Sequence, residues 1–131
     1  MNHIAGCEWI VEAHGCDPAA LASLERLRAL FSGLIVALAL RPVREPLWHQ
    51  FPPSPRGPGG ITGLCLLAES HLACHTFPEH GSLCLNLFCC RERPEFDFAA
   101  VLQHEFAAAR VDVRRLARPY AAAALPAASV S

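Results

Sequence analysis

The stretch that decides the fold is residues 61–90, which read ITGLCLLAESHLACHTFPEHGSLCLNLFCC. It contains three largely apolar runs, Ile61–Ala68, His71–Phe77 and Ser82–Cys90, separated by connections of only a few residues. Runs of this length with short, Gly- or Pro-containing connections are typical of strands joined by hairpins. The stretch therefore predicts a three-stranded antiparallel meander, and the rest of the chain is interpreted around it.

The segments before the meander predict a short strand and a long helix. Glu8–Val11 reads as the strand, and Asp17 is placed to cap the helix that follows. Apolar residues then recur at helical spacing, at Leu21, Leu24, Leu27, Phe31, Leu34, Ile35 and Leu38. The spacing keeps its phase through Gly33, so we prefer a helix continuing to about Leu40 over one that stops at Gly33 before a buried strand at Leu34–Leu40.

The remaining segments complete an α+β domain. Prolines weaken Val43–Phe51, which predicts an irregular or edge strand, and Pro52–Gly60 predicts a surface loop. After the meander, a second helix is expected to open at Pro94, Val111–Leu116 reads as a last short strand, and the Ala-rich tail Ala121–Ser131 is expected to fray. We therefore expect an antiparallel or mixed β-sheet with helices packed on one face.

Composition excludes several classes of function. The chain has 131 residues and a net charge of −1, and all 11 of its basic residues are arginine. Without lysine it cannot anchor pyridoxal phosphate, and without a basic face it is not expected to bind nucleic acid or an anionic membrane surface. No apolar run approaches the ~20 residues that span a bilayer and no secretory leader is recognised, which predicts a cytoplasmic protein. The apolar fraction of 53% predicts an oligomeric interface.

Ionisable side chains are concentrated inside the apolar meander. Because burying such a group without a partner costs roughly 2–7 kcal/mol, the concentration needs a reason, which is either a functional site or polar groups satisfied by hydrogen bonds within the core. The candidate metal ligands are His71, Cys74, His75, His80, Cys89 and Cys90. There is no Cys-x-x-Cys pair, and neighbouring strand residues point to opposite faces, which disfavours a metal site. A thiol nucleophile activated by histidine is a second hypothesis, and Cys7, Cys65 and Cys84 are interpreted as packing residues.

A further interpretation comes from a resemblance to a known family. The matching segments are Gly60–Gly63, Ala68–His71, His75–Gly81 and Phe88–Cys90. They resemble the prokaryotic S-adenosylmethionine decarboxylase proenzymes, which are pyruvoyl enzymes of polyamine synthesis. A weaker resemblance covers most of the chain, at Glu12, Gly15–Asp17, Trp48–Phe51 and Arg110–Arg118. The resemblance implies the fold of that family, a sandwich containing the expected sheet and helices.

The resemblance implies that the chain cuts itself. Ser70 would attack the carbonyl before it, and the Glu69–Ser70 bond would break. Residue 70 would then carry a pyruvoyl group, the cofactor that forms a Schiff base with the substrate. The single domain, residues 1–131, would become a chain of residues 1–69 and a pyruvoyl-bearing chain of residues 70–131.

The resemblance also implies roles for three further residues. His75 matches the histidine that accepts a proton during processing, and Thr62 matches a hydroxyl residue that assists it. Cys90 matches the cysteine that donates a proton during decarboxylation. A thiol is mostly protonated at pH 7, which suits a donor. A register slip of one residue would place Cys89 in that role instead.

For the substrate, the resemblance implies S-adenosylmethionine, whose decarboxylated product donates the aminopropyl group of spermidine. Phe51 and Phe77 match the two aromatic residues at the adenine, and Glu79 matches the acid that accepts hydrogen bonds from the ribose. The alternatives are a pyruvoyl-dependent ornithine or arginine decarboxylase and, more remotely, a non-enzymatic His/Cys metal-binding domain. The resemblance further implies a homodimer of cleaved protomers.

The sequence departs from the family pattern at several positions. Phe77 stands where the family usually has Trp, Asn86 where it has Asp, and Glu8 where it has His. Arg91 replaces a usual Gly, and the loop Pro52–Gly60 is about five residues longer than in relatives, an insertion that costs little. These departures surround the expected substrate pocket and leave the processing residues in place.

Overall fold

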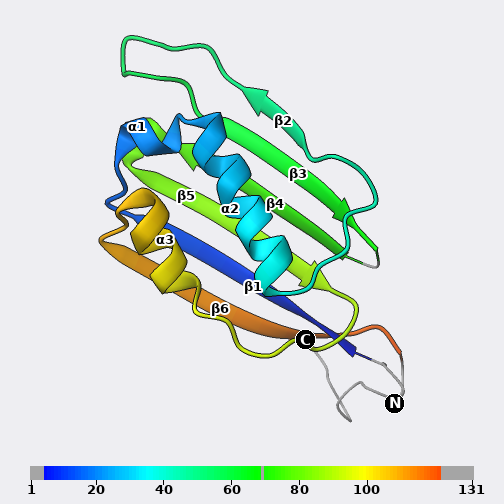
Figure 1. Ribbon diagram of the computed structural model, residues 1–131. Helices are drawn as coiled ribbons and strands as arrows, with labels where there is room; N and C mark the ends of the chain where they lie inside the picture. Colours follow the sequence, from blue (N-terminus) through cyan, green and yellow to red (C-terminus); the bar gives the residue numbers. More distant parts are fainter. Residues whose placement is uncertain (1–4, 69, 122–131) are drawn as a thin grey trace, which may run out of the picture.

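A single antiparallel sheet of six strands organises the protein (Figure 1). The computed structural model describes residues 5–68 and 70–121. In chain order the strands are β1 (Ala5–His14), β2 (Leu47–Gln50), β3 (Ile61–Leu67), β4 (Ser70–Phe77), β5 (Ser82–Cys89) and β6 (Arg110–Pro119). They lie in the order β2-β3-β4-β5-β1-β6, and every pairing is antiparallel. The expected meander, β3-β4-β5, forms the middle of the sheet and is confirmed.

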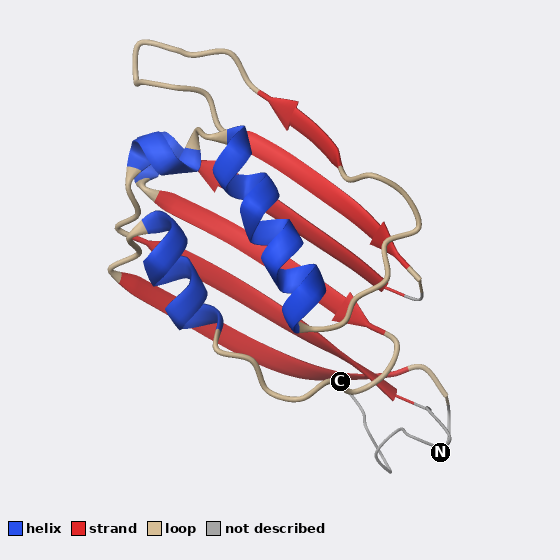
Figure 2. Cartoon of the chain, in the orientation of Figure 1, coloured by secondary structure: helices blue, strands red, loops and turns tan. Residues whose placement is uncertain are grey.

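The helices all cover one face of this sheet (Figure 2). They are α1 (Pro18–Leu21), α2 (Leu24–Ala37) and α3 (Phe98–Phe106), and a short 3-10 turn, η1 (Pro78–His80), links β4 to β5. The core lies between the helices and the sheet and includes Trp9, Phe31 and Phe106, all nearly inaccessible to solvent. Within the described part of the chain, no helix is both long and apolar enough to cross a membrane.

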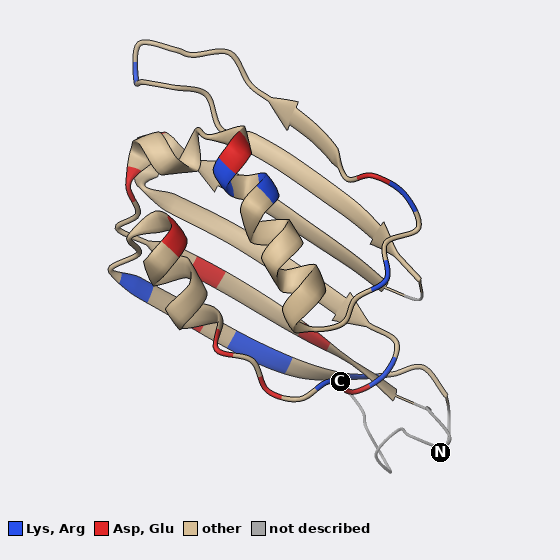
Figure 3. Ribbon diagram, in the orientation of Figure 1, with Lys and Arg blue, Asp and Glu red and all other residues tan. Residues whose placement is uncertain are grey.

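The other side of the sheet, called the open face below, carries the polar side chains of the meander. Side chains alternate along a strand, so Leu72 and Thr76 of β4 are buried under the helices, whereas His71 and His75 lie on the open face. The meander strands contain no Asp, Glu or Arg, and the charged residues of the sheet lie on β1 and β6 (Figure 3). The open face thus combines an uncharged centre with a charged border.

Several predicted boundaries needed correction. The helix continues through Gly33, as preferred, but it ends at Ala37 rather than near Leu40. It is also divided near its start into α1 and α2. The break falls at Ser23, which caps α2 by accepting a hydrogen bond from the backbone amide of Arg26. The second helix does not open at Pro94. It begins at Phe98 because the Asp97 carboxylate caps the amide of Ala100 at 3.0 Å.

The strands at the ends of the chain are longer than expected, since β1 and β6 pair with each other over their full lengths. The expected edge strand within Val43–Phe51 is confirmed as the four residues of β2. The fraying predicted for the tail concerns residues 122–131, which lie outside the described residues.

One buried hydroxyl joins the meander to the helical layer. Thr76 is the buried polar residue of β4, and its Oγ1 donates to the carbonyl of Leu21 at 2.8 Å. The same oxygen accepts a hydrogen bond from the backbone amide of Ile61 at 2.9 Å. Because Thr76 lies between His75 and Phe77, this junction of α1, β3 and β4 fixes the backbone from which both of those side chains project.

We expect Thr76→Val to destabilise the protein by about 2–4 kcal/mol, because the change keeps the shape but leaves two buried backbone groups unsatisfied. Urea unfolding of the chain carrying Ser70→Ala, which removes the hydroxyl expected to cut the chain, measures the difference with and without Thr76→Val. The control is Thr76→Ser, which retains the hydroxyl and should lower the free energy of unfolding clearly less. Equal stability of the Val and Ser variants would contradict the role of the two hydrogen bonds.

Candidate active site

Thr62 and His75 form a hydrogen-bonded pair on the open face. They are direct cross-strand partners in the β3–β4 register, and Thr62 Oγ1 lies 3.0 Å from His75 Nδ1. The hydroxyl therefore holds one side of the imidazole and limits its rotation. A histidine held in this way suits proton transfer near neutral pH.

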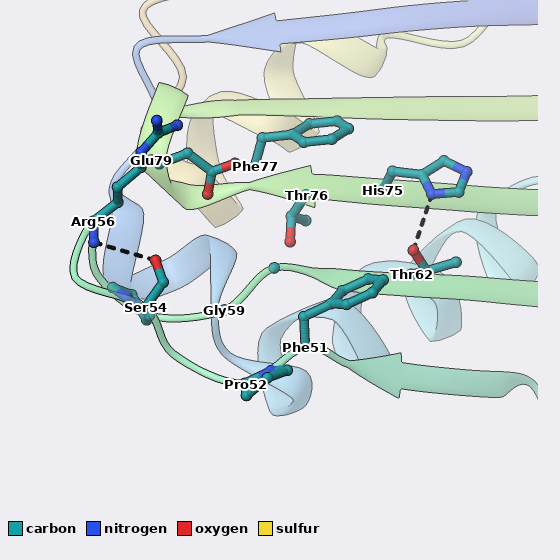
Figure 4. Close-up of a pocket in the computed structure, with 12 residues that line it drawn as sticks. Phe51, Pro52, Ser54, Arg56, Gly59, Thr62, His75, Thr76, Phe77 and Glu79 are labelled. Atoms are coloured by element: carbon teal, nitrogen blue, oxygen red, sulfur yellow. Dashed lines mark hydrogen bonds between the residues drawn. The ribbon is translucent and has the colours of Figure 1, made fainter.

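A cavity of about 570 Å³ opens beside this pair (Figure 4). Its lining includes all three residues expected to bind substrate, Phe51, Phe77 and Glu79, together with Thr62 and His75. Both phenyl rings are partly exposed, at 51% for Phe51 and 38% for Phe77. Aromatic faces, an acid and a histidine in one cavity suit a flat heterocyclic ligand that carries hydroxyl groups.

Much of the cavity wall comes from the loop between β2 and β3, which the sequence analysis interpreted only as a surface loop. The loop residues in the lining are Pro52, Ser54, Arg56, Pro58, Gly59 and Gly60. The loop closes at its base through a hydrogen bond from the amide of Phe51 to the carbonyl of Gly60, at 2.9 Å.

This loop is built tightly at both its tip and its base. Reciprocal 2.9 Å backbone hydrogen bonds join Ser54 and Gly57 at the tip. A Cβ atom at Gly59 would come within 1.8 Å of the Phe51 carbonyl oxygen, so only glycine fits there. The alternation of proline and glycine in the sequence was the available signal that this loop has a fixed shape.

Ser70 lies at the opposite end of β4 from the cavity. It pairs with Leu67 of β3 and Cys89 of β5, and its Oγ donates to the carbonyl of Ala68 at 3.3 Å. Glu69, the other residue of the expected cleavage site, lies outside the described residues. Since an extended strand rises about 3.3 Å per residue, Ser70 and His75 are about 16 Å apart along β4.

The two candidate donor cysteines differ in their surroundings. Cys89 is the cross-strand partner of Ser70 and is 1% exposed, and burial raises the pKa of its thiol. Cys90 directly follows β5 and is only partly buried. Both therefore lie at the Ser70 end of the sheet, and the register alone does not choose between them.

Of the remaining thiols, four are buried and Cys84 is partly buried. Burial raises the pKa of Cys74 to about 12, and it also raises the pKa of Cys16, Cys65 and Cys84. These shifts favour inert thiols over nucleophiles. Across residues 5–68 and 70–121, no three His, Cys, Asp or Glu side chains come together as a group that could hold a metal ion.

Comparison with known proteins identifies the family. Residues 7–119 match the family described as S-adenosylmethionine decarboxylase. Relatives named S-adenosylmethionine decarboxylase proenzyme include one from Caldicellulosiruptor saccharolyticus, 36% identical over 70% of this chain and 68% of that protein. Another, from Pelotomaculum thermopropionicum, is 29% identical over 90% of this chain and 89% of that protein.

Other relatives are longer than the matched region. The proenzyme from Thermococcus gammatolerans is 32% identical over 69% of this chain, but the match spans only 59% of that protein. The fold also matches a solved structure, the adenosylmethionine decarboxylase from Aquifex aeolicus VF5. The TM-score is 0.73 with 23% identity, over 99% of this chain and 100% of that one, so this comparison supports the fold alone. From the family match over residues 7–119, the chain belongs to the S-adenosylmethionine decarboxylase family.

Proposed function

We propose that this protein is a self-processing decarboxylase that acts on S-adenosylmethionine to supply the aminopropyl donor for polyamine synthesis. Family membership and the names of the relatives support this reading. The observation that carries it is the Thr62–His75 pair in the wall of a cavity with two exposed aromatic rings and an acid. Such a cavity fits a nucleoside, whereas ornithine or arginine needs neither a stacking ring nor a ribose acceptor.

The proposed cofactor is a pyruvoyl group made from Ser70 when the chain breaks after Glu69. Such a group supplies a ketone that takes up the electron pair left when CO₂ departs, as pyridoxal phosphate does elsewhere. Ser70 fits this origin because its hydroxyl turns back toward the preceding residues, where Oγ reaches the carbonyl of Ala68. The absence of lysine from the chain agrees with a cofactor that needs no lysine anchor.

Each remaining site residue has a role that its position supports. Phe51 and Phe77 stack on adenine, and Glu79 accepts hydrogen bonds from the ribose hydroxyls. His75, held by Thr62, takes up the α-proton of residue 70 during processing. Cys90 returns a proton to the product carbon, with the buried Cys89 as the alternative.

The separation of Ser70 from His75 supports a site shared with a second copy of the chain. Proton transfer needs heavy atoms about 3 Å apart, and one extended strand holds these two residues about 16 Å apart. A two-fold axis across the open face would bring the cavity end of one protomer to the Ser70 end of the other. Exposed leucines on that face, Leu47, Leu64, Leu66 and Leu116, support an interface there.

The first consequence is cleavage before position 70. Intact mass of the purified protein is expected to show two fragments, residues 1–69 and residues 70–131, with the second lacking its amino group. Ser70→Ala should leave one uncut chain, because it removes the attacking hydroxyl, whereas the matched control Ser82→Ala should cut normally. A single uncut wild-type chain would contradict the proposed processing.

A site shared between two protomers predicts that two inactive variants can complement each other in cleavage. Ser70→Ala and His75→Ala variants, each made alone, should stay uncut. When they are co-expressed, the His75→Ala chain should be cut before Ser70, because its partner provides the intact His75. Mass spectrometry of the mixed sample measures this. An uncut mixture, or cutting of the His75→Ala variant alone, would count against a site shared between two copies.

Decarboxylation tests the proposed proton donor. The wild-type protein should release CO₂ from S-adenosylmethionine, and Cys90→Ser should slow release by about 10²-fold or more while cleavage continues, since the hydroxyl is a far weaker acid than the thiol. Cys89→Ser is the matched control and should retain most of the activity.

If Cys89→Ser slows CO₂ release more than Cys90→Ser does, the donor role belongs to Cys89. Ornithine and arginine, assayed beside S-adenosylmethionine, should release no CO₂. Release from either of them in place of S-adenosylmethionine would contradict the proposed substrate.

A further inference from the structure

His71 occupies a defined place on the open face, one residue beyond Ser70. Its cross-strand partners are Leu66 of β3 and Phe88 of β5. The imidazole stacks on the Phe88 ring, with centroids 5.7 Å apart and planes 14° from parallel. The guanidinium of Arg118 lies 5.5 Å from the centroid of the same phenyl ring. These contacts give the ring a fixed plane near the end of the sheet where cleavage is proposed.

A chain of hydrogen bonds determines which ring nitrogen of His71 carries the proton. Arg118 pairs with one carboxylate oxygen of Glu8, and the other oxygen accepts from Asn86 Nδ2 at 2.6 Å. Hydrogen bonds from Asn86 and Arg118 hold the pKa of the Glu8 carboxyl below its usual value although burial opposes this, so the carboxylate is charged and can only accept.

The charged Glu8 carboxylate fixes which atom donates in each of the next two hydrogen bonds, from Asn86 to Glu8 and from His71 to Asn86. Since the NH₂ group of Asn86 faces Glu8, its Oδ1 faces His71, where it lies 2.9 Å from Nε2. An amide oxygen cannot donate, so Nε2 of His71 must carry the proton. In the neutral ring the lone pair is therefore on Nδ1, and none of the residues 5–68 and 70–121 forms a hydrogen bond to that atom.

We propose that the chain Arg118–Glu8–Asn86 holds His71 as a base whose Nδ1 accepts the proton of the substrate's α-ammonium group. This inference rests on the proposed function, because it concerns the amine that must react with the carbonyl of residue 70. His71 is joined to residue 70 by a peptide bond that cleavage leaves intact, so its ring stays beside residue 70. Alternation along β4 directs the ring to the open face and the Ser70 side chain, opposite the buried Cys89, to the other face, so the substrate amine would reach Nδ1 from the open face. Glu8 and Asn86 are two of the departures from the family pattern, and they contact each other directly.

The proposed step is a single proton transfer. The N–H bond of the substrate ammonium breaks, its electron pair stays on nitrogen, and the proton bonds to Nδ1 of His71. The nitrogen then has the lone pair that attack on a carbonyl carbon requires. A later transfer from Nδ1 to solvent restores the neutral ring, so that no other reactant is needed.

The groups around His71 come from four strands. The charged groups in the hydrogen-bonded chain are Glu8 of β1 and Arg118 of β6, while the neighbours on β3 and β5 are Leu66, Phe88 and Asn86. Because Glu8 stays charged and can only accept, it fixes the orientation of the Asn86 amide and, through it, the position of the ring proton of His71.

Nitrogen NMR of the uncut, full-length Ser70→Ala chain tests the tautomer without any activity. At neutral pH the His71 ring should show a protonated Nε2 and an unprotonated Nδ1. Adding Asn86→Ala should give a mixture of tautomers, whereas the matched control Asp112→Asn, also on the open face, should leave the His71 signals unchanged. A proton on Nδ1 in the parent chain, or no response to Asn86→Ala, overturns the proposed positioning.

Kinetics of the processed enzyme test the base itself. His71→Ala should still be cut, but its kcat/KM for S-adenosylmethionine should fall by about 10²-fold, with partial rescue by added imidazole. Glu8→Gln, which removes the charged acceptor that orients the Asn86 amide, should also lower kcat/KM for S-adenosylmethionine, and Asp112→Asn should not.

The two proposals fail in different ways. Wild-type turnover in a cut His71→Ala variant overturns the role of His71 while the proposed function stands. An uncut, inactive wild type overturns the proposed function, and the NMR result still reports whether the Glu8–Asn86–His71 chain exists.

Discussion

The extension of β4 is the constraint on which the site depends. Antiparallel pairing with β3 and β5 keeps the strand extended from Ser70 to Phe77. This places His75 opposite Thr62 in the cavity wall and places Ser70 opposite Cys89 at the far end. Because a paired strand cannot fold back on itself, the two halves of the chemistry stay about 16 Å apart in one chain. The proposed homodimer would join them.

The two faces of the sheet differ in what they carry. Burial of side chains such as Leu72 under the helices anchors the strands, and the Thr76 hydroxyl links them to α1. The open face carries His71 and His75, and a partner's sheet would shield both from water. Hydrogen bonds there strengthen as the local dielectric falls, so pairing of protomers would reinforce the Thr62–His75 contact and the chain that ends at His71.

The parts of the fold that depend on local pattern could be predicted from the sequence. The three meander runs matched β3, β4 and β5 within about two residues, because alternation and short turns act between near neighbours. The start of α3 was missed, since capping by Asp97 outweighed the helix-opening preference of Pro94. The role of residues 52–60 as a cavity wall was also missed, because the place of this loop over the site depends on close backbone contacts of Gly59 with Phe51 and of Gly60 with Thr76. The Glu8–Asn86 contact joins residues 78 apart in the chain and needed the β1–β5 pairing.

The most direct test of a site shared between protomers is a crystal structure of the uncleaved Ser70→Ala protein, in which the distance from residue 70 to the nearest His75 imidazole is measured. The account predicts a separation of about 16 Å within one chain and an approach to near hydrogen-bond distance, about 3–4 Å, between residue 70 of one chain and His75 of its partner. A monomer, or a dimer in which the His75 of the same chain is the nearer one, would contradict it.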